Sequence, residues 1–99
     1  FEIDEASKTK LDNVAALLAS DPSLRVEIEG RTDNRGTEAY NIVLGAQRAE
    51  AVRQYLLAKG AEAARLTTLS IGEFKPVASN ETEDGRRANR SVQFRVIRR

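Results

Sequence analysis

The 99-residue sequence contains no cysteine, no histidine, no methionine and no tryptophan. Without histidine and cysteine, the chain lacks the commonest general base, the thiol nucleophile and the usual ligands of zinc. It also has no apolar run near the roughly 18 residues that a membrane-spanning helix needs. We therefore expect no enzyme of the usual hydrolytic types, no metal and no cofactor. Without cysteine, the redox compartment stays open.

An excess of charge of one sign is also absent, because 16 Lys and Arg side chains face 15 Asp and Glu side chains. This balance creates no overall field that would favour nucleic acid or an anionic membrane. The segment after Asp84 differs, because it contains six arginines and no acidic residue. It is either a solvated strand edge with a charged tail or an anion-binding rim.

The apolar pattern predicts a single α+β domain over residues 1–99. Hydrophobic residues make up 40% of the chain and aromatic residues 5%, which indicates one aliphatic core. Leu24, Val26 and Ile28 alternate with charged residues, as in a strand with one buried face. We expect strands at 1–3, 24–29, 66–71 and 92–96, and helices around residues 11–18 and 37–59. This is a βαβαββ two-layer sandwich, a small mixed sheet with helices on one face.

The helix at 37–59 has the clearest signals. Thr37 is a suitable N-cap and Lys59-Gly60 a suitable end. A period of 3.6 residues predicts that the buried stripe consists of Tyr40, Val43, Leu44, Val52, Tyr55 and Leu56.

Polar residues beside that stripe indicate a binding site. Asn41, Gly45 and Arg48 share one side of the helix, and Asp33 lies on the Asp-Asn-Arg-Gly turn just before it. A carboxylate and a guanidinium held close together match a zwitterionic amino-acid head group, with the ammonium on Asp33 and the carboxylate on Arg48. Alternatively, Asp33 and Arg48 pair with each other and Gly45 serves only helix packing.

The sequence resembles the OmpA-like peptidoglycan-binding domains over essentially its whole length. The match is long and gapped, which makes it far more specific than a short motif. It comprises the opening Phe1-Glu2-Ile3-Asp4, the run 29–36, Tyr40-Asn41, Leu44, Arg48-Ala49, Val52, Tyr55-Leu56, Gly60, Arg65-Leu66, Gly72, Pro76, Asn80, Thr82, Gly85-Arg86 and Asn89-Arg90.

The resemblance implies noncovalent binding of the peptidoglycan peptide stem through the amine and carboxylate of diaminopimelate. In such domains, the positions of Asp33 and Arg48 grip the ligand. The resemblance further implies secondary contacts from Asn41 and Arg90, with Thr32 and Asn34 lining the turn. We expect modest affinity from a shallow, solvent-exposed site, and one helical turn at 84–89 that carries Arg90 toward it.

The resemblance also implies a location and partners. We expect a domain excised from a larger envelope protein in the bacterial periplasm, attached to the outer membrane or envelope only through parts outside this sequence. Peptidoglycan is the expected partner and nucleic acid is not, while a weak homodimer stays open.

Two positions depart from the family pattern. Arg31 replaces the usual histidine and either tunes affinity or pairs with Glu29, and Ser91 replaces a second basic residue.

Three other functions remain as alternatives. The domain could be a scaffold that binds proteins without peptidoglycan. Glu27 and Glu29, on one face of a strand, could form a glycosidase pair, but they fit a solvent face better. An RNA-binding sheet would need exposed aromatic residues, whereas Phe94 is expected in the core.

Overall fold

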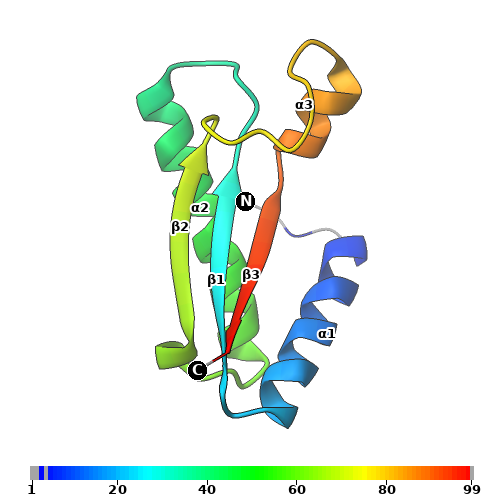
Figure 1. Ribbon diagram of the computed structural model, residues 1–99, viewed down its shortest axis with the longest axis vertical. Helices are drawn as coiled ribbons and strands as arrows, with labels where there is room; N and C mark the ends of the chain where they lie inside the picture. Colours follow the sequence, from blue (N-terminus) through cyan, green and yellow to red (C-terminus); the bar gives the residue numbers. More distant parts are fainter. Residues whose placement is uncertain (1–2, 4, 99) are drawn as a thin grey trace.

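The computed structural model describes residue 3 and residues 5–98 (Figure 1). Its elements are, in order, α1 (Glu5–Ser20), β1 (Leu24–Arg31), α2 (Glu38–Ala58), the short 3₁₀-helix η1 (Ala63–Arg65), β2 (Leu66–Gly72), α3 (Glu83–Asn89) and β3 (Val92–Arg98).

The three strands form a mixed sheet in the order β2-β1-β3, in which β1 is parallel to β2 and antiparallel to β3. Figure 1 shows α2 behind the sheet and α1 along its β3 side. Both helices contribute side chains to one core, so the predicted α+β arrangement with helices on one face is confirmed. A parallel pair of strands needs a crossover connection, which α2 supplies between β1 and β2.

The core follows the predicted alternation of β1. Leu24, Val26 and Ile28 are at most 2% exposed and face the helices. Leu11 and Leu18 from α1 pack against the same cluster. Val52 and Leu56 complete it from α2, and Phe94 is partly buried against it, as expected.

The predicted apolar stripe of α2 is wrong in its first half. Tyr40 and Val43 are 61% and 55% exposed, whereas Asn41 and Gly45 are buried. The cause is a close contact between α2 and β1: a Cβ atom on Gly30 would lie 1.8 Å from the carbonyl oxygen of Gly45. Gly45 therefore serves helix packing, which was one of the two readings of this residue.

The predicted first strand falls largely on residues 1 and 2, which lie outside the described residues. Ile3 is described, and it belongs to no strand but packs partly buried against the core. Within the described part of the chain, no helix is long and apolar enough to cross a membrane. The same residues contain no group of three or more acidic, His or Cys side chains placed to hold a metal ion.

Candidate functional site

The candidate site lies where one end of the sheet meets the start of α2 and the end of α3, at the top of Figure 1. The parallel strands β1 and β2 both end there, and β3 begins there. Asp33 follows β1 by two residues, and Arg90 is the C-cap of α3. Residues far apart in sequence are thus brought to the same end of the sheet.

Local hydrogen bonds shape the turn that carries Asp33. The backbone N–H of Thr32 donates to the Gly72 carbonyl at 2.8 Å, which ties the turn to the end of β2. The backbone N–H of Arg35 donates to Asp33 Oδ1 at 3.0 Å, the bond of an Asx turn. Gly36 has a φ of 85°, which other residues rarely adopt, and Thr37 then caps α2 as predicted.

Asn41 holds this turn from inside. Its side chain is 1% exposed, and its Nδ2 donates to the carbonyl oxygens of Asp33 and Arg35 at 3.3 and 2.9 Å and to Glu73 Oε1 at 3.1 Å. Thr32 is also buried, and its hydroxyl donates to the Asp33 carbonyl. Both side chains position the turn in this conformation, whereas Asn34 is exposed on it.

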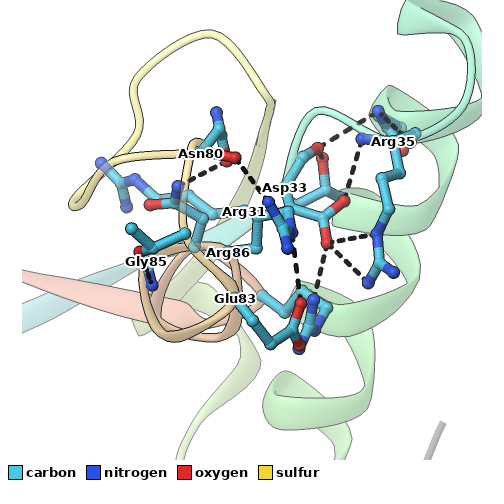
Figure 2. Close-up of polar contacts among 12 residues, drawn as sticks. Arg31, Asp33, Arg35, Asn80, Glu83, Gly85 and Arg86 are labelled. Carbon is cyan, nitrogen blue, oxygen red and sulfur yellow. Dashed lines mark hydrogen bonds and ion pairs between the residues drawn. The ribbon is translucent and has the colours of Figure 1, made fainter.

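The Asp33 carboxylate is already bound by arginines of its own chain. Its Oδ2 accepts from Arg35 Nε and Nη2 at 3.1 and 3.0 Å, and from Arg90 Nη1 at 2.7 Å. Figure 2 shows Arg35 pointing toward Asp33. The expectation of a solvent-exposed site is wrong for this acid, because its side chain is only 7% exposed.

The charged neighbours decide the ionisation of Asp33. Burial by itself raises the pKa of the carboxyl, because it disfavours the charged form. The backbone N–H of Arg35 and the guanidinium groups of Arg90 and Arg35 outweigh burial and lower the pKa to about 2. Asp33 is therefore a carboxylate throughout the physiological pH range.

Helix α3 delivers Arg90, as predicted for the turn at 84–89. Thr82 caps this helix by accepting from the Gly85 N–H. Arg90 Nη2 donates to Glu83 Oε1 at 2.8 Å, so this arginine bridges two carboxylates. The hydrogen bond to Glu83, followed by the one to Asp33, raises the pKa of Arg90.

Arg48 reaches the same end of the sheet from α2. Its Nη1 donates to the Arg31 carbonyl at 2.8 Å, which orients the guanidinium beside the turn. Burial lowers the pKa of Arg48, the charge of Asp33 raises it and that of Arg90 lowers it again. Asp33 thus interacts electrostatically with Arg48, while its shortest ion pair is with Arg90.

Arg31 makes contacts within the domain. Its Nη1 lies 3.1 Å from Glu29 Oε1, and its Nε donates to the Lys75 carbonyl. The pairing with Glu29 is one of the two roles proposed from the sequence, and the structure shows it directly.

The sequence did not single out Arg35 or Glu83 as part of this site. A spacing of seven residues places Glu83 and Arg90 on one side of a helix, which was a usable signal. The contact of Arg35 with Asp33 lies within a four-residue turn and was also a candidate ion pair.

A cavity of about 310 Å³ reaches Arg90 from the side of α1 and β3. Its lining includes the apolar residues Leu11, Val52 and Phe94 and the charged residue Lys10. Neither Asp33 nor Arg48 lines this cavity, and the Asp33 carboxylate is bound instead by Arg35 and Arg90.

This fold is that of an OmpA-type domain. The chain belongs to the OmpA family, whose model matches residues 1–90. The resemblance noted in the sequence is thereby confirmed.

Individual relatives agree with this assignment. The chain is 45% identical over 86 residues to the peptidoglycan-binding protein ArfA of Mycobacterium tuberculosis, covering 87% of this chain and 26% of that protein. It is 48% identical over 80 residues to the peptidoglycan-associated lipoprotein of Pasteurella multocida, covering 81% of this chain and 53% of that protein. The chain therefore spans about a quarter to a half of these relatives.

A solved structure gives the same result. The crystal structure of the peptidoglycan-associated lipoprotein from Burkholderia pseudomallei superimposes with a TM-score of 0.92 at 35% identity, covering 97% of this chain and 81% of that one.

Proposed function

We propose that this domain binds peptidoglycan noncovalently and anchors an envelope protein to the cell wall. Membership of the OmpA family supports this function, as do two relatives whose names state peptidoglycan binding or association. The proposal includes a periplasmic location, a single domain over residues 1–99 and a binding role without catalysis.

At finer detail, the ligand is the diaminopimelate residue of the peptide stem. Asp33 accepts from its ammonium, and Arg48 donates to its carboxylate. The observation that carries this assignment is the position of the two side chains. A carboxylate of depressed pKa and a partly buried guanidinium interact electrostatically at one end of a rigid sheet.

The other site residues have supporting roles in this proposal. Arg90 holds the Asp33 carboxylate through a hydrogen bond to Oδ2, and Thr32 and Asn41 fix the backbone of the turn. Asn34 is exposed on the turn and is free to approach the bound peptide. A lysine-type stem lacks the side-chain carboxylate for Arg48 and should bind more weakly.

The test is an NMR titration of the domain with a diaminopimelate-containing muropeptide. We expect saturable shifts around the turn at 32–36 and the start of α2, and at least a tenfold weaker affinity for Arg48→Gln. Arg53→Gln is the matched control, because Arg53 lies on the same helix and pairs with Glu50 away from the site.

The control variant should bind like the wild type. Equal losses in Arg48→Gln and Arg53→Gln would contradict a specific role of Arg48 and indicate a general effect of charge. A wild type that shows no saturable shifts would mean that the fold serves another partner, and the scaffold function would replace the one proposed.

A further inference from the structure

Both oxygens of the Asp33 carboxylate are occupied before any ligand arrives. Oδ1 accepts from the Arg35 backbone N–H, and Oδ2 accepts from the side chains of Arg35 and Arg90. With its side chain 7% exposed, Asp33 has little surface to offer. A ligand cation can reach Oδ2 only if one of the two arginines moves away.

The two arginines differ in how firmly they are held. The Arg90 side chain is 25% exposed, it lies 2.7 Å from Asp33, and a second carboxylate, Glu83, holds it at 2.8 Å. The Arg35 side chain is 64% exposed, and the contacts described for its guanidinium are all with Asp33. Water solvates the charge of a mostly exposed arginine well once it leaves its partner, so the separation costs less than for a more buried arginine. Arg35 is therefore the arginine that leaves.

We propose that Arg35 is a resident counterion of Asp33 that the ligand's ammonium group must displace, and that it thereby sets the affinity of the site. This inference rests on the proposed binding of an ammonium group at Asp33. In the free domain, the Arg35 guanidinium occupies the place of that ammonium. Binding is an exchange of one cation for another, and the ligand gains only the difference between the two contacts.

The exchange leaves the turn intact. The backbone N–H of Arg35 still donates to Oδ1, and Asn41 still holds the Asp33 and Arg35 carbonyl oxygens. Only the Arg35 side chain swings into solvent, where it is already mostly exposed. Shortening this side chain should therefore open the site without unfolding it.

The experiment compares Arg35→Gln with Arg87→Gln. Each variant removes one exposed arginine and one positive charge, but Arg87 is 71% exposed and lies 3.9 Å from Asp84 on α3. The first measurement is the NMR titration of the Asp33 carboxyl without ligand. Its pKa should rise from about 2 in Arg35→Gln and stay unchanged in Arg87→Gln.

The second measurement is the affinity for a diaminopimelate-containing muropeptide. Arg35→Gln should bind about two- to fivefold more tightly than the wild type, because the ligand no longer has to break a weak ion pair with a mostly exposed arginine. Arg87→Gln should bind like the wild type.

Three other outcomes would overturn the inference, and a fourth would support it in a stronger form. An unchanged Asp33 pKa in Arg35→Gln would show that the contact is absent in solution. Weaker or equal binding by Arg35→Gln, with a wild type that binds, would overturn the exchange while the proposed function stands. If neither protein binds, the proposed function fails together with the exchange, whereas binding by Arg35→Gln alone would show that Arg35 blocks the site.

Discussion

The two halves of α2 bury different kinds of residue. The second half packs Ala49, Val52 and Leu56 into the aliphatic core. The first half buries Asn41 and Gly45, while its large side chains Tyr40 and Val43 remain exposed. One continuous helix therefore serves the hydrophobic core at one end and a polar hydrogen-bond network at the other, and the proposed site depends on the polar end.

The largest loss of stability should come from a substitution in the apolar half of α2. Leu56 is fully buried, so Leu56→Ala removes apolar contacts and leaves a cavity. We expect a loss of about 3 kcal/mol in the free energy of unfolding, measured by denaturant titration. Leu17→Ala is the control, because Leu17 is 45% exposed on α1 and should cost much less.

The folded Leu56→Ala protein should keep its affinity for muropeptide, because Leu56 lies slightly more than four turns beyond Asn41 on α2. A specific loss of binding by this variant at temperatures where it is folded would contradict the separation of the two halves.

A smaller but more local effect is expected from Asn41→Ala. The substitution removes the donor to the Asp33 and Arg35 carbonyl oxygens and to Glu73. Unsatisfied buried acceptors should cost about 2 kcal/mol in the free energy of unfolding. Native-state hydrogen exchange should show that the substitution accelerates exchange of the amides in the turn at 32–36 more than exchange of the amides in β1.

The control for this variant is Asn34→Ala, which removes an exposed asparagine from the same turn and should leave the exchange rates unchanged. If all amides of Asn41→Ala exchanged uniformly faster, Asn41 would stabilise the whole domain, as the apolar core residues do, and not the turn in particular.

The difference between the halves also explains what the sequence could predict. The alternation in β1, the N-cap at Thr37 and the end of α2 depend on neighbouring residues, and all three are confirmed. The burial of Asn41 and exposure of Tyr40 depend instead on the contact between Gly30 and Gly45, which belong to different elements. A 3.6-residue period counts apolar residues and so misses a helix face that packs through glycine and asparagine.

The same limit applies to the site. The sequence placed Asp33, Arg48 and Arg90 at one site, and the structure brings these three side chains near one another. The sequence alone could not rank Arg35, Arg48 and Arg90 by how strongly each binds Asp33. That ranking depends on distances across 57 residues of chain and on the exposure of each arginine.

The smallest expected effect is the pH dependence of stability that Asp33 causes at the polar end of α2. The pKa of Asp33 lies at about 2 in the folded domain and near the ordinary 3.8 in the unfolded chain. Because the folded pKa is lower, Asp33 contributes stability above pH 3.8, and this contribution is lost as the pH falls to about 2. The wild type should therefore lose about 1–2 kcal/mol more than Asp33→Asn between about pH 5 and about pH 2, measured by denaturant titration at each pH.

Asp84→Asn is the control, because the Asp84 side chain is 97% exposed on α3, and this variant should follow the wild-type pH profile. Leu56→Ala changes no charged group, so it should lower the whole curve without changing its shape. If Asp33→Asn and the wild type lost stability in parallel, the arginines would not stabilise the charged form of Asp33. The polar end of α2 would then be held by Asn41 and backbone hydrogen bonds alone.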